Sequence, residues 1–397
     1  MISLEKRYAS AVGISAIGAA TSFLSILIYG AISDVSLMAQ ILFIIGFIEL
    51  FCSLTNFGIT QYIHRYHHTK DSTRIALTIK IPLSLLATLP VALYLTSTSI
   101  ISGDNASIAI VLPTLILHSL SRLYADIQES KSSFISAQLI RATPSIFRLF
   151  GALAMLLNSE LRNLQFFSLV ELLPVVGSTI YGALNNALNI KEFGKVPKEA
   201  ARYMVSYYAN DIVVIPVNPS FIRVLASSFL PNSSFVILGI VQTFLYPIAR
   251  FSPPTLMKGS IIRELSNKHN ADLIEAKTRI SRQTNVFSAI SSIAALSVLT
   301  IYYWTTKQNI SQAIILTAIV GCASMWVTSI KMLKEVFAQV HEQQFDIVKS
   351  SFVSTVFGIL FCGLCLIFDV LWIAVGGFAA IVWMLCFYML SKQQRDL

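Results

Sequence analysis

Charge is scarce in this sequence: only 12% of its 397 residues are Asp, Glu, Lys or Arg, whereas 55% are hydrophobic. The mean hydropathy is +0.70. This composition excludes an ordinary soluble domain, in which about a quarter of the residues are charged. The chain is therefore expected to be a membrane protein with many spanning segments, and their summed length leaves nothing over for a separate soluble domain.

Cysteine is also rare, and its placement excludes a disulfide framework. All the cysteines lie inside predicted helices, at Cys52, Cys322, Cys362, Cys365 and Cys386. They are expected to pack as small apolar side chains. The spacing Cys362-x-x-Cys365 has no companion ligands that would make it a zinc or redox motif.

No constellation of catalytic residues is present. The outer connections are expected to be short, near 33–35, 99–105, 158–163, 231–232, 305–309 and 369. They leave no room for an active-site loop. The longest inner loop, 258–280, lacks a phosphate-binding Gly-Lys-Ser/Thr signature and is expected to form an amphipathic helix on the inner surface. The chain is therefore not expected to be an enzyme, and no cofactor is predicted.

Long apolar runs, in contrast, fill the sequence and predict an all-α integral membrane protein of twelve transmembrane helices. The helices are expected near 9–32, 36–63, 75–98, 106–128, 132–157, 164–190, 203–230, 233–257, 281–304, 310–335, 347–368 and 370–391. The seventh and eighth contain Pro216, Pro219, Pro247, Pro253 and Pro254, and the stretch "VVIPVNPS" is expected to break the seventh. The first run continues to Ile32, so it is expected to remain as a helix and not to be cleaved as a signal peptide.

The cations are distributed unevenly between the two sides of this arrangement. With the N-terminus inside, the outer connections hold only Arg162 and Lys307, and almost all other Lys and Arg residues lie at the inner side. Short loops rich in Lys and Arg stay cytoplasmic. Both termini are therefore predicted to be cytoplasmic, and the net charge of +9 needs no nucleic-acid partner.

The first inner loop begins in the stretch "SLTNFGITQYIHRYHHTKDSTR", residues 53–74. Gly58 permits a bend or a close approach, and Asn56 is expected to satisfy nearby backbone groups. His64-x-x-His67-His68 has ligand spacing, but no acid or cysteine stands beside it in the sequence. An interfacial basic cluster is therefore favoured, and no metal site is predicted.

Six charged residues fall deep inside predicted helices, where an unpaired charge is costly: Glu49, Arg141, Arg148, Glu171, Asp211 and Arg223. Arg148 and Glu171 occupy the outer halves of consecutive helices and are predicted to form a structural ion pair. Arg141 has no acid at its own depth in either flanking helix, so it is predicted to face water and substrate. His118, alone in its helix, is expected to be a hydrogen-bonded packing residue.

Two stretches carry a resemblance to a known family. "IELFCSLTNFGITQYIHRYHH" and "LYPIARFSPPTLMKGSIIRELSN" resemble the end of the second helix, and the Pro-containing eighth helix with its following loop, in bacterial polysaccharide flippases of the O-antigen type. Twelve helices, inner termini and short outer loops match over essentially the whole chain. The resemblance implies the multidrug, oligosaccharidyl-lipid and polysaccharide exporter superfamily. It also implies two six-helix lobes, 1–195 and 196–397, around a central cavity.

The same resemblance implies a function in the bacterial inner membrane. A flippase of this kind moves an undecaprenyl-diphosphate-linked oligosaccharide from the cytoplasmic to the periplasmic leaflet by alternating access, for surface polysaccharide such as the O-antigen of lipopolysaccharide. The implied partners are this substrate and membrane lipids, with a polysaccharide polymerase and a chain-length regulator as further candidates. The deep charges of this chain sum to zero, whereas family members tend to have a cation-lined lumen.

Site residues follow from these expectations. The predicted substrate-binding cations are Arg141, Arg148, Arg223, Lys80 and Arg122, and the predicted proton or Na⁺ sites are Glu49 and Asp211. Two other functions stay open. An ion-coupled exporter of small molecules in the same superfamily would share the fold, and a membrane-embedded glycan-modifying enzyme would show turnover that depends on a particular acid or His.

The cation asymmetry predicts which positions a membrane-impermeant thiol reagent reaches in intact cells. In a background without native cysteines, Gly103→Cys, Ser233→Cys and Gln308→Cys should be labelled from outside. Lys70→Cys and Asn270→Cys should be labelled only after the membrane is permeabilised. Labelling of Lys70→Cys in intact cells would contradict the twelve-helix topology.

Overall fold

The computed structural model describes residues 4–66, 72–98, 100–101, 103–131, 133–185, 196–215, 218–228, 230–250, 252–256, 258, 261–262, 265, 270–305, 312–340 and 344–367. These residues form helices and connections without any strand. The chain divides into two compact units, Met1–Tyr208 with Arg223–Val236, and Ala209–Ile222 with Ile237–Leu397. Each unit is described by itself; the predicted lobe boundary at 195 stays a prediction.

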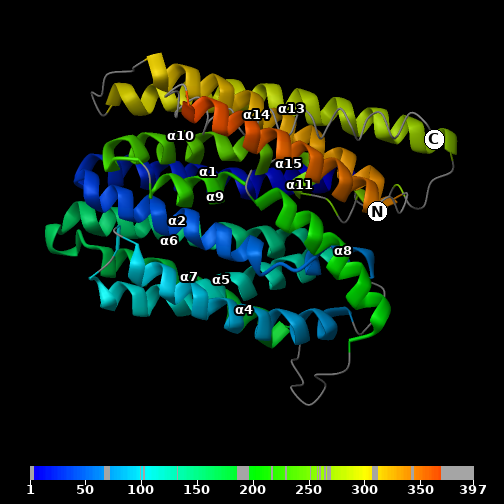
Figure 1. The fold of residues 1–397 in the computed structure, drawn as a ribbon, viewed down its shortest axis with the longest axis horizontal. Coiled ribbons are helices and arrows are strands. Elements are labelled where there is room, and N and C mark those ends of the chain that lie inside the picture. The colour runs from blue at the N-terminus through cyan, green and yellow to red at the C-terminus, as the bar shows by residue number, and fades with distance from the viewer. Residues whose placement is uncertain are drawn as a thin grey trace. The chain divides into compact units, whose positions relative to one another are not determined.

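The first unit is a bundle organised around one helix. Its helices are α1 (Leu4–Ile32), α2 (Val35–Leu54), α3 (Ile59–Arg65), α4 (Ser72–Ser97), α5 (Asn105–Ser130), α6 (Phe134–Leu157) and α7 (Leu164–Asn185), with the short 3-10 turn η1 (Ser159–Leu161) before α7. α5 packs against α2, α3, α4, α6 and α7, and α1 lies along α6 (Figure 1). Residues on α5 can therefore reach almost every other helix of the unit.

The remaining helices follow in chain order. α8 (Lys198–Val214), α9 (Pro219–Ala226) and α10 (Asn232–Arg250) include residues of both units, and the second unit continues with α11 (Pro253–Leu256), α13 (Asn270–Thr305), α14 (Gln312–Val340) and α15 (Gln344–Ile367). α13 packs against α14, and α14 against α15. Phe244, Tyr302 and Tyr303 make edge-to-face ring contacts in this unit.

The structure confirms an all-helical membrane fold. Within the described residues, seven helices are long and apolar enough to cross a membrane. Eleven of the twelve predicted spans have a helical counterpart, and the twelfth, 370–391, lies outside the described residues. The predicted break in the seventh span is present, since α8 ends at Val214 and α9 begins at Pro219, whereas Pro247 lies inside α10, which runs to Arg250. The described cysteines Cys52 and Cys322 are buried and free.

One predicted element, the amphipathic helix of the loop 258–280, is wrong in its second half; most of 258–269 lies outside the described residues. Residues 270–280 do not form a separate amphipathic helix on the inner surface, because they are the first turns of α13, which runs unbroken from Asn270 to Thr305. No Gly or Pro interrupts residues 270–305, so the helix propagates through them. Its 36 residues span about 54 Å at a rise of about 1.5 Å per residue, well beyond the roughly 30 Å of a hydrocarbon core.

The predicted second helix, 36–63, is broken where its apolar run gives way to polar residues. α2 ends at Leu54 and α3 begins at Ile59, with Phe57 and Gly58 both in the left-handed region, at φ 51° and φ 67°. The Asn56 side-chain oxygen accepts from the backbone N–H of Thr60 at 3.4 Å. A side chain at Gly58 would contact the carbonyl oxygen of Met204. Gly58 therefore serves both for the turn and for a close approach of α8.

Gly58→Ala should destabilise the protein more than Gly103→Ala. Both glycines have positive φ, but a Cβ at Gly103 has nothing within 4 Å, whereas one at Gly58 would meet the α8 backbone. The φ strain shared by both variants is worth about 1–2 kcal/mol, so the difference between them isolates the steric contact. The measurement is the melting temperature in detergent. Equal shifts would show that α3 and α8 do not approach as described.

Candidate functional site

The ion pair between Arg122 of α5 and Glu49 of α2 is half-exposed. The Arg122 Nη2 atom contacts Glu49 Oε2, and the two side chains are 39% and 23% exposed. Both residues lie on segments that qualify as membrane spans, and most of α2 around Glu49 is buried. A guanidinium has five N–H donors, and part of the Arg122 side chain is exposed.

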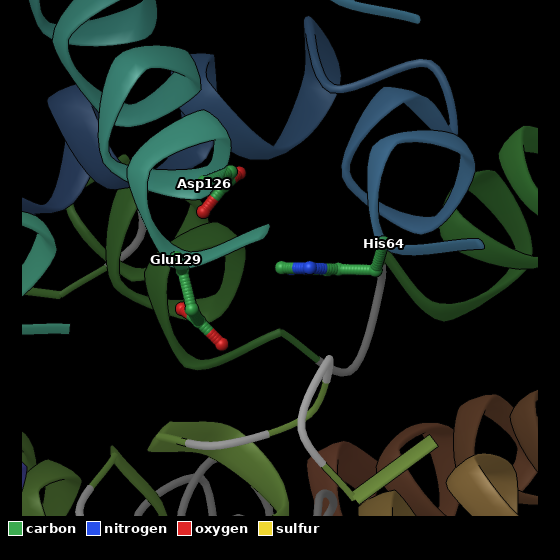
Figure 2. Close-up of side chains that lie close together, drawn as sticks. All are labelled: His64, Asp126 and Glu129. Carbon is green, nitrogen blue, oxygen red and sulfur yellow. The ribbon is translucent and has the colours of Figure 1, made fainter. Parts of the chain in front are cut away.

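A second group of charges lies where α3, α5 and α6 meet; we refer to His64, Asp126, Glu129 and Arg141 as the inner cluster. The Arg141 guanidinium contacts Asp126 Oδ1 at 2.6 Å and Glu129 Oε2 at 2.7 Å. The hydroxyl of Thr60 donates to Asp126 Oδ2 at 2.6 Å. Figure 2 shows the His64 ring pointing towards the two carboxylates, which project from the same helix.

The inner cluster corrects the interpretation of Arg141. Its predicted role rested on the absence of an acid at its depth, yet it contacts two. In a helix each Cα–Cβ bond tilts towards the N-terminus, so a long side chain on α6 reaches back to the last turn of α5. α5 also continues to Ser130, which places Glu129 inside the helix. Arg141 is therefore a paired residue and not an isolated cation.

The predicted environment of His64, an interfacial basic cluster, is also wrong. It is only 3% exposed and lies beside acids that are more than sixty positions away in sequence, so it does not belong to an interfacial basic cluster. Its predicted companions His67 and His68 lie outside the described residues. The pairing of Asp126 with Glu129 could have been found in the sequence, since their i, i+3 spacing places both on one face of a helix. The nearby sequence does not indicate that His64 joins them.

Arg148 of α6 and Glu171 of α7 form the ion pair that was predicted for them. Arg148 Nε contacts Glu171 Oε1, and Nη2 donates to Oε2 at 2.8 Å, a two-pronged arrangement. His118 Nε2 lies 3.5 Å from Glu171 Oε2, and the Tyr29 hydroxyl donates to the Arg148 carbonyl oxygen at 3.1 Å. All these side chains are buried. This geometry fixes the packing of α1, α5, α6 and α7 and leaves Arg148 with no exposed face for substrate.

Lys80, one of the predicted substrate-binding cations, is buried. It is 3% exposed, and its ammonium donates to the Thr55 carbonyl oxygen at 2.8 Å. That carbonyl belongs to the end of α2, where the helix terminates and leaves acceptors without partners in the helix. Lys80 therefore ties α4 to the α2–α3 break.

The other predicted residues lie near the proline break. Arg223 of α9 is 6% exposed and packs against α2, where the missing side chain of Gly46 makes room for it. Burial argues against direct contact with a substrate in this conformation. Asp211 is half-buried in α8. The ion-coupling roles of Asp211 and Glu49 stay predictions, and Glu49 shares its charge with Arg122.

Replacing both members of the buried pair should cost less than replacing one. Glu171→Ala leaves the Arg148 guanidinium buried without its acid, which typically costs about 3–5 kcal/mol, whereas Glu171→Ala with Arg148→Ala removes both charges. The melting temperature in detergent should therefore be lower for the single variant than for the double variant. Glu160→Ala, which removes an exposed acid, is the control. Additive losses would show that the two residues are not coupled.

The chain matches no protein-family model and no curated protein. Solved structures are similar across almost its whole length. A MOP superfamily transporter from Pyrococcus furiosus Vc1 has a TM-score of 0.68 at 11% identity, covering 98% of this chain and 96% of that one. An outward-facing multidrug resistance MATE family transporter of the MOP superfamily has a TM-score of 0.66 at 12% identity, with the same coverage.

A third similar structure is the lipid II flippase MurJ in an inward closed conformation. It has a TM-score of 0.67 at 14% identity, covering 96% of this chain and 86% of that one. Identities this low establish architecture and not substrate. The chain therefore has the all-helical membrane fold of these transporters and flippases.

Proposed function

We propose that this protein is a transporter of the multidrug, oligosaccharidyl-lipid and polysaccharide exporter superfamily, and that it flips a lipid-linked oligosaccharide across the bacterial inner membrane. The observation that carries the proposal is the half-exposed Arg122–Glu49 pair on two membrane spans. The fold supports a transport role, because the similar structures are transporters and a flippase and none of them is an enzyme.

The exposure of the pair has a direct physical consequence. A charged side chain open to hydrocarbon costs several kcal/mol, so charges within spans face protein or a water-filled path. Arg122 and Glu49 are neither fully enclosed nor at a helix end, so the pair is assigned to the wall of an aqueous path. A polar head group needs such a path, because it cannot cross hydrocarbon without its hydrogen-bond partners.

Arg122 supplies the chemistry for one part of the proposed substrate. A planar guanidinium matches the oxygens of a phosphate better than an ammonium does. The proposed substrate carries a diphosphate between its sugars and its polyprenyl chain, so the head group would occupy the aqueous path while the chain stays in lipid. Entry from the cytoplasmic leaflet agrees with the predicted inner position of the termini and basic loops.

A small-molecule exporter is the second candidate. The multidrug transporters resemble this chain as closely as the lipid II flippase does, so the fold favours neither. Such an exporter would use an ion gradient, for which Glu49 and Asp211 are the predicted sites. The two candidates differ in cargo: a flippase moves a lipid-anchored head group between leaflets, whereas an exporter moves a soluble molecule between compartments.

A reconstituted assay separates the two candidates. Proteoliposomes containing a fluorescent undecaprenyl-diphosphate sugar are treated with an impermeant quencher, and the fraction of protected lipid reports flipping. A second batch loaded with a fluorescent organic cation reports export. Flipping without cation export supports the proposal, whereas cation export without flipping identifies the exporter.

Within this assay, Arg122→Ala should reduce flipping at least tenfold, because the diphosphate loses its guanidinium partner, and Arg122→Lys should retain part of the activity through its charge. Arg162→Ala is the matched control, since it removes an exposed arginine from the connection between α6 and α7. Rescue of surface polysaccharide in cells that lack the gene provides the in vivo readout. Full activity of Arg122→Ala at normal abundance would remove Arg122 from the path.

A further inference from the structure

The inner cluster combines two carboxylates and an imidazole. One ligand atom from each of His64, Asp126 and Glu129 can be chosen so that all three lie within 4.8 Å of one another. The residues come from two helices, α3 and α5, and converge on one point (Figure 2). His64 is 3% and Glu129 1% exposed, so the group is enclosed by protein and not spread over a surface.

An independent observation shows that this group has unused binding capacity. Arg141 takes Asp126 Oδ1 and Glu129 Oε2, and Thr60 reaches Asp126 Oδ2. The remaining oxygen, Glu129 Oε1, is buried and has no hydrogen-bond partner among the described residues. A buried carboxylate oxygen normally has a partner, and leaving one unsatisfied is destabilising. The oxygen therefore marks a place where a ligand would be stabilised.

The charge balance indicates the sign of that ligand. Asp126 and Glu129 contribute two negative charges, Arg141 contributes one positive charge, and a neutral His64 contributes none. With His64 neutral, these four side chains sum to a net charge of minus one in a largely enclosed place. A cation is thus favoured, and the imidazole restricts which one, because Mg²⁺ and Ca²⁺ prefer all-oxygen sites whereas zinc-like ions accept imidazole nitrogen together with carboxylate oxygen.

We infer that His64, Asp126 and Glu129 form a binding site for a zinc-like divalent metal ion, with Arg141 as a charged neighbour. Tetrahedral ligands at about 2.1 Å from one ion lie about 3.4 Å apart, so separations of up to 4.8 Å need to contract by up to about 1.4 Å. Side-chain rotation would supply this movement. The ion would join α5 to α3, which begins just after the Phe57–Gly58 break, and three protein ligands would leave it an open position.

The test uses the full-length protein in detergent, stripped with a chelator and then incubated with Zn²⁺. After removal of free metal, elemental analysis should find about one zinc per chain. Glu129→Gln and His64→Gln should each weaken zinc binding at least tenfold in a titration, while size-exclusion profiles and helix content stay unchanged. Zinc should also raise the melting temperature of the wild type more than that of either variant, because a ligand stabilises the state that binds it.

Three controls locate the site. Glu160→Gln removes an exposed acid, His118→Gln removes a buried histidine from a different group, and a His67→Gln/His68→Gln variant removes the adjacent histidines of the loop; all three should keep the zinc. The inference is overturned if the wild type retains no zinc, which would leave a proton on His64 as the balancing cation. It is equally overturned if Glu129→Gln binds zinc normally, or if only the loop variant loses it.

Discussion

A charge inside a bilayer must have an opposite charge, a hydrogen-bond partner or water within reach, and this requirement organises the first unit. His118, Arg122, Asp126 and Glu129 recur at helical spacing along α5, within one broad face. Their contacts reach several parts of the bundle. His118 lies by Glu171 of α7 and Arg122 by Glu49 of α2. Asp126 and Glu129 both contact Arg141 of α6, and Asp126 also accepts from Thr60 of α3. The position of α5 in the bundle is thus matched by a polar face that connects it to its neighbours.

The two arginine–glutamate pairs of the first unit differ in how exposed they are. The Arg148–Glu171 pair is enclosed by four helices and gains two hydrogen bonds in return for its lost hydration, an arrangement suited to fixing a packing. The Arg122–Glu49 pair is open and so retains access to water. In the sequence the two pairs look the same, each being an arginine and an acid on nearby helices. Only the Arg122–Glu49 pair is partly exposed in the structure.

The sequence was sufficient to predict features that depend on hydropathy averaged over a long window, or on contacts between consecutive helices. Hydropathy over about twenty residues located eleven segments that have a helical counterpart in the structure, and a tight hairpin was enough to pair Arg148 with Glu171. It was insufficient where a side chain crosses between distant segments. The expectation for Arg141 used the position of its backbone, whereas its guanidinium reaches Asp126 and Glu129 near the end of α5. His64 and Glu129 are sixty-five positions apart, and no local pattern indicates that Gly58 turns α3 towards α5.

The pairing of deep cations with acids, such as Arg122 with Glu49, also bears on how a cargo could be released. A lumen lined by unpaired cations would hold a diphosphate strongly in every conformation, and a path must bind its cargo well enough to admit it but weakly enough to let it leave. Arg122 already contacts Glu49. To donate to a phosphate it gives up part of that contact, so a hydrogen bond to the phosphate replaces one that already exists. The near-zero sum of the deep charges is therefore compatible with a phosphate-bearing cargo, provided that recognition uses exchange at Arg122 and not a general electrostatic field.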